Sequence, residues 1–385
     1  MKLVVQVKLL PTPEQAPALE ATLRACNRAA TYASQVAFAK HLKDRNGLQK
    51  EVYADLKATF GLSAQPVVRA VKKVVDAYAT LKANLQAGNL GPPTSKRHRT
   101  ALSTPIAFRP EAAQPFDDRC LSWQYDARTV SIWTVDGRMK GVRFACSPDQ
   151  LKTLVQYRKG ESDLVQRGGK WFSMATCDIP EPAVYEPAGW IGVDRGIVNL
   201  ATTSDGTNHQ GRRLSRYRRR QARKRAELQA GQTRSATRRL ARRTRKERRH
   251  ATQVNHVISK EIVSVAQRTG RGIAVEHLGG IRERVRLRRD QRDTLSSWPF
   301  HQLGQHLAYK AKRAGVPFLE VDAAYTSQRC PRRGHTERAN RPTRDHFRCR
   351  RCGLAGPADV VAGVNVRDRA RSVWAFVTMP VPQPV

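Results

Sequence analysis

Two short apolar segments of this sequence each end in an acidic residue, and this pattern restricts the fold more than any other feature. Residues 190–193 are followed by Asp194, and residues 272–275 are followed by Glu276. A third acid, Asp359, precedes small residues that predict the first turn of a helix packed on a sheet. Carboxylates that meet at one place repel each other unless divalent cations lie between them. The pattern predicts an α/β domain in which these acids bind two Mg²⁺ ions and hydrolyse a phosphodiester bond.

The net charge of the chain indicates its class of partner. Lys and Arg number 70 against 32 Asp and Glu, which gives a formal net charge of +38. A charge this large destabilises a compact fold by self-repulsion unless a polyanion neutralises it. We therefore expect a surface that encloses a long nucleic-acid backbone. A structural RNA-binding protein would also explain the charge, but it would not explain the three acids.

Basic residues are densest between residues 212 and 249, where Glu227 and Glu247 are the only acids. Gly231 predicts a break between two helices, and apolar residues recur at helical spacing after the stretch. We expect this helical pair to face nucleic acid, together with two lysines of an amphipathic helix near residues 66–83. The predicted contacts are Arg212, Arg213, Arg216, Arg218, Arg219, Arg220, Arg223, Lys224, Arg238, Arg239, Arg242, Arg243, Lys72 and Lys73.

The N-terminal half contains a strand, a helical part and then a group of short strands. Residues 2–10 alternate like a strand, and segment 12–15 has the residue types of a helix N-cap. Residues 129–134 and 140–144 flank an Asp-Gly pair, which predicts a hairpin. Prolines from position 180 onward predict a linker before the domain that carries the acids.

The cysteines and the hydropathy indicate a cellular compartment. Four of the seven cysteines are scattered singly, which is not typical of a disulfide framework. No apolar stretch approaches the ~20 residues that a membrane span requires. We therefore expect a cytoplasmic protein that does not associate with a membrane.

Four sequence blocks surround the acids, at residues 191–199, 274–278, 325–330 and 359–365. In order and composition they resemble the signature blocks of the TnpB family of insertion-sequence RNA-guided nucleases, which are relatives of compact type V CRISPR effectors. The order Asp, Glu, Asp also argues against a transposase of the Asp-Asp-Glu type. One departure is Val-Ala-Gly at residues 361–363, where the family usually has Asn-Ala-Ala. This departure keeps the acid but affects the packing of the last helix.

The resemblance implies a two-lobed α/β multidomain protein with a positive channel between the lobes. One lobe would hold a wedge-type β-barrel with an inserted helical recognition lobe. The other would hold a ribonuclease H-like RuvC nuclease domain with a zinc-ribbon-type insertion that binds target nucleic acid. The implied ranges are 1–12 and 91–182 for the barrel, 13–90 for the recognition lobe, 183–325 and 356–385 for the nuclease domain, and 326–355 for the insertion.

The resemblance also implies an activity. The chain would bind a guide RNA derived from the transposon end, read a short target-adjacent motif, form an RNA–DNA hybrid and cleave double-stranded target DNA, with Asp194, Glu276 and Asp359 as catalytic Mg²⁺ ligands. It would act as a protein monomer in a ribonucleoprotein of a prokaryotic cytoplasm. Two alternatives remain open: a compact type V CRISPR effector of the same fold, and a guided DNA-binding repressor, which should have lost one of the acids.

A Cys-x-x-Cys pair predicts a zinc site in the insertion. Cys349 and Cys352, followed by glycine, form a half-knuckle in which backbone amides turn toward two thiolates. The family has the same spacing in its first half-knuckle, but after Cys330 this chain has Arg333 at the second cysteine position. His335 would take the place of this cysteine, with His346 as the second choice. The alternative is a loop that binds no metal. The predicted Zn²⁺ ligands are Cys330, His335, Cys349 and Cys352.

Overall fold

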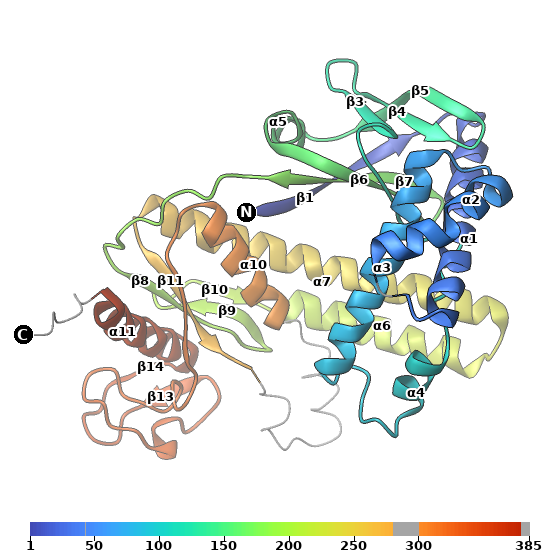
Figure 1. Cartoon of the computed structure of the whole chain (residues 1–385). Coiled ribbons are helices and arrows are strands. Elements are labelled where there is room, and N and C mark those ends of the chain that lie inside the picture. The colour runs from blue at the N-terminus through green and yellow to red at the C-terminus, as the bar shows by residue number, and fades with distance from the viewer. Residues whose placement is uncertain (43, 280–299, 379–385) are drawn as a thin grey trace, which may run out of the picture. The chain divides into compact units, whose positions relative to one another are not determined.

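The computed structural model describes residues 1–42, 44–279 and 300–378. Parts of the predicted nuclease domain, residues 280–299 and 379–385, therefore lie outside the described residues. The chain divides into two compact units, Met1–Pro180 and Glu181–Val385, and Figure 1 shows their elements. Among the helices that the structure describes, none is long and apolar enough to cross a membrane.

The first unit contains an antiparallel sheet that curls toward a barrel. Its strands pair in the order β2-β6-β7-β1-β5-β4-β3. The terminal strand β3 nevertheless reaches β6, because Trp123 Nε1 donates to Ser162 Oγ at 3.4 Å. The sheet is therefore nearly closed around one core. The strands are β1 (Lys2–Leu10), β2 (Gln114–Phe116), β3 (Leu121–Gln124), β4 (Thr129–Thr134), β5 (Gly137–Ala145), β6 (Arg158–Arg167) and β7 (Lys170–Asp178), with α5 (Pro148–Tyr157) before β6.

The predicted hairpin is confirmed, because β4 and β5 pair in antiparallel register with Thr134 opposite Gly137. The predicted helix start is also confirmed. Gln15 N donates to Thr12 Oγ1 at 3.2 Å, and Thr12 N donates to Gln15 Oε1 at 3.1 Å. This reciprocal pair satisfies backbone donors at the helix N-terminus, which a helix cannot satisfy internally.

Three helices follow β1 and share a core of their own. Alanines 29, 30, 33 and 37 of α1 are buried, and their small side chains let the other two helices approach closely. Leu48, Val52 and Leu56 recur every four residues on the buried face of α2. The helices are α1 (Gln15–Ala39), α2 (Arg45–Phe60) and α3 (Ala64–Gln86), and a short α4 (Lys96–Ser103) follows them.

The second unit contains a five-stranded mixed sheet, in the order β10-β9-β8-β11-β12. The central strand β8 pairs in parallel with β11, which pairs in parallel with β12, whereas β9 and β10 are antiparallel. The strands are β8 (Trp190–Asp194), β9 (Asn199–Thr203), β10 (Asn208–Gln210), β11 (Gly272–His277) and β12 (Phe318–Asp322). The helices are α6 (Arg212–Ala230), α7 (Arg234–Arg268), α10 (Phe300–Arg313) and α11 (Ala358–Thr378).

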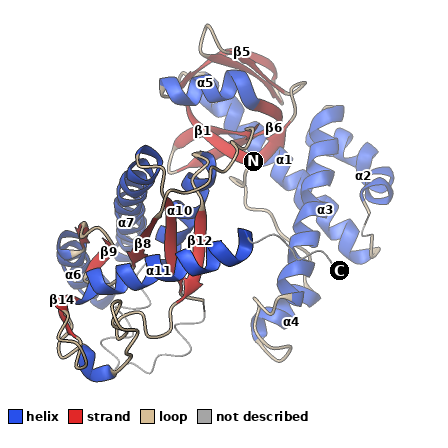
Figure 2. Ribbon diagram, turned by 90° about the vertical axis from the view of Figure 1, so that its left-hand side faces the viewer, coloured by secondary structure: helices blue, strands red, loops and turns tan. Residues whose placement is uncertain are grey.

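Helices cover both faces of this sheet. Ile191 and Val193 of β8 share a core with apolar residues of α7 and α10. Trp190, on the other face because strand side chains alternate, packs with Val366 and Ala370 of α11. The sheet is therefore buried on both faces, as parallel strands require. Figure 2 shows α11 running across the strands.

Two glycines bring α11 into close contact with β8. A Cβ at Gly192 would lie 1.9 Å from Gly363 O, and a Cβ at Gly363 would lie 3.0 Å from Ser204 N. Neither position has room for a side chain unless the backbone moves. Gly363 belongs to the Val-Ala-Gly departure, and close packing of helix on strand explains this glycine.

The segment between β12 and α11 forms a small subdomain, which we call the insertion (residues 323–357). It contains a short 3₁₀ helix (Arg338–Asn340) and the antiparallel pair β13 (His346–Arg348) and β14 (Ala355–Pro357). Its core consists of Cys330, Phe347 and Cys349 packed against the start of α11. The insertion therefore leads directly into the helix that carries Asp359.

Candidate active site

The structure brings the three predicted acids together. Asp194 ends β8, Glu276 lies in the parallel neighbour β11, and Asp359 lies in the first turn of α11. Burial and the charges of Glu276 and Asp359 raise the pKa of Asp194 well above its usual range. Burial also raises the pKa of Glu276. Asp194 therefore lies where burial and two neighbouring carboxylates disfavour its negative charge.

The carboxylates are not clustered on one point. Only one group of three or more Cys, His, Asp or Glu ligand atoms lies within 4.8 Å in the part of the chain that the structure describes, and that group is in the insertion. The three acids are therefore spaced more widely.

Glu276 is held by the loop after β12. Thr326 Oγ1 donates to Glu276 Oε1 at 2.5 Å. Asn365 of α11 fixes this loop, because its Nδ2 donates to the carbonyls of Thr326 and Arg329, each at 2.7 Å. The guanidinium of Arg195, which is 6% exposed, donates to the backbone carbonyl of Glu276. Helix α11 thus positions Glu276 as well as Asp359.

Asp359 has two partners from distant parts of the second unit. Asn199 Nδ2 donates to Asp359 Oδ2 at 2.8 Å, and Arg341 Nη2 donates to Oδ1 at 2.9 Å. Arg341 is itself anchored, because Nη2 donates to the carbonyl of Arg344 at 2.6 Å. Through Arg341, the insertion therefore places a positively charged guanidinium beside Asp359. Sequence reasoning missed the roles of Thr326, Asn199 and Arg341; the first two lie in the blocks that resemble the TnpB family, whereas nothing in the sequence pointed to Arg341.

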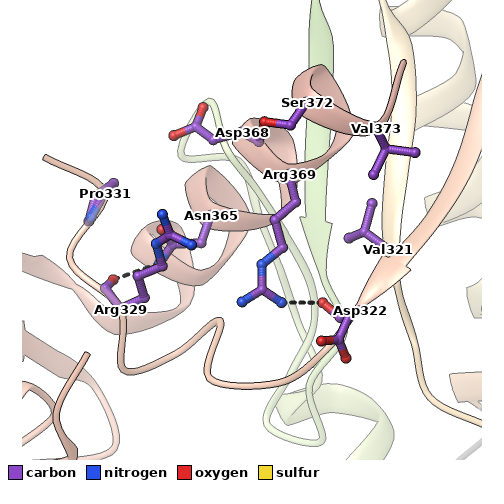
Figure 3. Close-up of a pocket in the computed structure, with 9 residues that line it drawn as sticks. All are labelled: Val321, Asp322, Arg329, Pro331, Asn365, Asp368, Arg369, Ser372 and Val373. Atoms are coloured by element: carbon purple, nitrogen blue, oxygen red, sulfur yellow. Dashed lines mark hydrogen bonds between the residues drawn. The ribbon is translucent and has the colours of Figure 1, made fainter. Parts of the chain in front are cut away.

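A cavity of about 340 Å³ lies between β12, the start of the insertion and α11 (Figure 3). Its charged lining is partly used in internal contacts, since the Arg369 guanidinium donates to the carbonyls of Asp322 and Ala324. The lining contains none of the three acids. The lining residues are Val321, Asp322, Arg329, Pro331, Asn365, Asp368, Arg369, Ser372 and Val373.

The structure brings together three of the four predicted zinc ligands. Cys330, Cys349 and Cys352 lie together, with Cys330 Sγ 3.6 Å from Cys352 Sγ. The His335 ring is not part of this group, and its Nε2 lies 3.1 Å from a Glu337 carboxylate oxygen. The backbone carbonyl of His335 accepts from Cys330 N in a tight turn. The second choice, His346, is exposed. The ligand group in the structure is therefore three cysteines.

The arginine-rich helices α6 and α7 form an antiparallel pair (Figure 1). Arg225 binds Glu247 at 2.6 Å, and Arg243 donates to Gln221 at 3.0 Å across the pair. Arg243 therefore stabilises the pair rather than facing outward, and burial lowers the pKa of Arg218, which is also half-buried. The predicted contacts that are exposed are Arg212, Arg213, Arg216, Arg219, Arg220, Arg223, Lys224, Arg238, Arg239 and Arg242.

Lys72 and Lys73 also need correction. Lys73 Nζ donates to the carbonyl of Ala113 at 2.6 Å, and burial lowers the pKa of Lys73 to about 8. Lys72 Nζ lies 3.2 Å from Glu161 and 3.3 Å from Asp76. Both ammonium groups are bound within the first unit, so the structure does not present them as free phosphate contacts. Sequence spacing alone could not show this, because the acceptors lie at least 40 residues away for Lys73.

Two models of known protein families match parts of the second unit and the end of the first. Residues 174–279 match the model OrfB_IS605, described as "Probable transposase", and residues 300–366 match "Cas12f1-like, TNB domain". The first match covers Asp194 and Glu276, and the second covers the three cysteines and Asp359. Both models therefore fall on the residues that form the candidate site.

Curated relatives of this chain have names that agree with the two family models. Cas12f1 of Syntrophomonas palmitatica, named a CRISPR-associated endodeoxyribonuclease, is 25% identical over 226 residues, which cover 54% of this chain and 44% of the relative. InsQ of Escherichia coli (strain K12), whose name describes an RNA-guided DNA endonuclease, is 30% identical over 230 residues (54% and 56%). The TnpB-like protein MJ0751 of Methanocaldococcus jannaschii is 32% identical over 132 residues (34% and 47%). The chain spans about half the length of these relatives. Its predicted relationship to the TnpB and Cas12f1 proteins is therefore confirmed.

Proposed function

We propose that this protein is an RNA-guided DNA endonuclease. Its catalytic site would be formed by the three acids of the second unit. The observation that carries this proposal is the convergence of Asp194, Glu276 and Asp359 from β8, β11 and α11, in the part of the chain that matches the two family models. One relative is named a CRISPR-associated endodeoxyribonuclease, and the name of another describes an RNA-guided DNA endonuclease. A structural RNA-binding protein would have no use for acids whose charges raise the pKa of Asp194.

The domain assignment belongs to the same proposal. The second unit has a mixed sheet with helices α7 and α10 on one face and α11 on the other, which suits a ribonuclease H-like RuvC domain split by the insertion. The curled sheet of the first unit suits a wedge-type barrel, and α1 to α3, which follow its first strand, suit a recognition lobe. We assign residues 323–357 to a target nucleic-acid-binding insertion.

The carboxylates fit Mg²⁺. The raised pKa of Asp194, caused by burial and by the charges of Glu276 and Asp359, shows a concentration of negative charge that a divalent cation would relieve. When bound, Mg²⁺ supplies an activated water and stabilises the leaving oxygen of a phosphodiester. The residues of the chain hold the geometry: Thr326 orients Glu276, whereas Asn199 and Arg341 orient Asp359.

We assign recognition of RNA and hybrid backbone to the exposed basic residues of α6 and α7. Internal ion pairs do not neutralise most of them, because Glu227 and Glu247 are the only acids between residues 212 and 249. Lys and Arg contacts of this kind bind phosphates without reading sequence. Sequence choice would then rest on the guide RNA, and the protein would read only a short target-adjacent motif.

A transposon-derived guide is favoured by the matches to OrfB_IS605, InsQ and the TnpB-like protein. The Cas12f1 matches favour the second candidate, a compact type V CRISPR effector. A repressor without cleavage is disfavoured because all three acids are present, and hydrogen bonds hold two of them, Glu276 and Asp359.

The decisive experiment begins with the RNA that copurifies with the full chain. Sequencing this RNA identifies the guide, and a DNA duplex matching the guide then serves as substrate with Mg²⁺. We expect cleavage that depends on both the match and the metal, and no cleavage by the Asp194→Ala variant. A parent protein that binds the matched DNA but never cuts it would contradict the endonuclease proposal and leave the repressor.

A further inference from the structure

The turn after Cys330 and the turn after Cys349 have the same backbone structure. Gly334 N donates to the carbonyl of Cys330 at 2.8 Å, and Gly353 N donates to that of Cys349 at 3.0 Å. Both glycines are left-handed, with φ of +68° and +71°. The N–H of each cysteine also donates to the carbonyl five residues later, at 2.8 Å in both turns. The two turns are copies of one geometry.

Both turns are built to present a thiolate. In each, the backbone amides two and three residues after the first cysteine point at the sulfur of that cysteine. Amides aimed at a sulfur are the half-knuckle arrangement of a tetrahedral metal site. The distance of 3.6 Å between Cys330 Sγ and Cys352 Sγ agrees with this, because two sulfurs about 2.3 Å from one tetrahedral zinc lie roughly 3.8 Å apart.

The equivalence of the two turns identifies the fourth corner. Cys352 is the third residue after Cys349, and the third residue after Cys330 is Arg333. A guanidinium has five N–H donors and no acceptor, so Arg333 cannot be a metal ligand. His335 does not lie with the cysteines and contacts Glu337. Among the described residues, no further His, Cys, Asp or Glu ligand atom completes the group.

We propose that this chain binds one Zn²⁺ through Cys330, Cys349 and Cys352 and takes the fourth ligand from solution, at the corner where Arg333 replaces a cysteine. Three protein ligands and one exogenous ligand are the coordination of open zinc sites, whereas structural sites are closed by four. Three thiolates and one Zn²⁺ leave a net charge of −1, which the arginines at positions 332, 333, 350 and 351 offset. The fourth ligand is then water, exchangeable for a small donor such as imidazole. This inference does not depend on the nuclease proposal.

The test uses the full-length chain with Co²⁺ in place of Zn²⁺, since Co²⁺ reports its ligands by absorption. Arg333→Cys places a thiolate at the fourth corner. Arg332→Cys is the matched control, because it removes the same charge and adds the same thiol one residue away. We expect one metal per chain in all three proteins. Thiolate charge-transfer absorption should rise by about one third in Arg333→Cys alone, in proportion to four thiolates instead of three.

Imidazole provides the second measurement. It should shift the visible Co²⁺ bands of the parent and of Arg332→Cys, and leave those of Arg333→Cys unchanged, because only the first two have an exchangeable ligand. Parent bands that ignore imidazole but change on His335→Ala or His346→Ala would overturn the proposal in favour of a histidine ligand. A purified parent with no zinc and a Cys330–Cys352 disulfide would also overturn it. If Arg333→Cys fails to fold, the response of the parent to imidazole decides.

Discussion

The second unit contains two candidate metal sites of opposite construction. The carboxylate group takes its residues from β8, β11 and α11, across 165 residues of sequence, and the packed sheet holds them. The three cysteines come from two turns within residues 330–352. Two of them, Cys330 and Cys349, belong to the small core of the insertion. The first site should therefore keep its shape without metal, whereas the second should depend on metal for its shape. Four predictions test this contrast.

The largest effect is expected on cleavage. Asp194→Ala should lower the rate of target cleavage by about 10³-fold or more, because metal ions contribute several kcal/mol of transition-state stabilisation. Guided DNA binding, measured by gel shift, should remain within about threefold, since the buried sheet is unaffected. Asp205→Ala is the control, an acid of the same unit that pairs with Arg271 outside the site. Near-parental cleavage by Asp194→Ala would show that the acid group is not the catalytic site.

The second prediction concerns the thiolate group. Removing zinc with a strong chelator, or changing Cys349→Ser, should abolish amide-exchange protection in residues 330–352 and leave that of β8 and β11 intact. Zinc held by four protein ligands contributes on the order of 10–16 kcal/mol to small isolated zinc domains, and zinc held by three cysteines should still contribute more than a core this small can replace. Cys146→Ser, which changes a thiol of the first unit, is the control. Unchanged protection after complete zinc removal would mean that packing alone holds the insertion.

The sequence predicted the residues of the two sites to different extents. The acids could be predicted because an apolar strand that ends in a carboxylate is a local pattern. The cysteines could be predicted from spacing, but the contact of the His335 ring with Glu337 could not, since it depends on how the turn folds. Lys73 was predicted to contact nucleic acid. The sequence could not show that Lys73 donates to the carbonyl of Ala113 instead, because this contact depends on tertiary packing. Arg341 was missed for the same reason: its contact with Asp359 exists only once the insertion folds.

Arg341 joins the two regions, so its removal sharpens the comparison. Arg341→Ala should lower cleavage about 10–100-fold, the usual cost of losing a hydrogen-bond partner of a metal ligand. Guide binding should not change, and Arg341→Lys should recover part of the activity because it retains the charge. Arg344→Ala is the control: it removes a neighbouring exposed arginine but keeps the carbonyl that anchors Arg341. Equal losses in both variants would indicate a general loss of charge.

The smallest effect should distinguish the sites by their response to pH. Burial and the charges of Glu276 and Asp359 raise the pKa of Asp194 above its ordinary value of 3.8. A carboxyl group with a higher pKa in the folded chain holds its proton more tightly there. In the presence of a chelator, this contribution to stability is therefore present at low pH and is lost as the pH rises from 3.8 through the raised pKa.

The comparison is between the parent and Asp194→Asn, which keeps the shape and removes the titration. The difference in their free energies of unfolding in chelator should change by about 1.4 kcal/mol for each unit of pKa shift, with the parent losing stability as the pH rises. Asp205→Asn should follow the parent. The thiolate site should respond in the opposite direction, because thiols must lose protons to bind zinc and protection in residues 330–352 should be lost as the pH falls. A parent and Asp194→Asn with parallel pH profiles would show that the acids do not repel one another, and would remove the charge argument for placing Mg²⁺ between them.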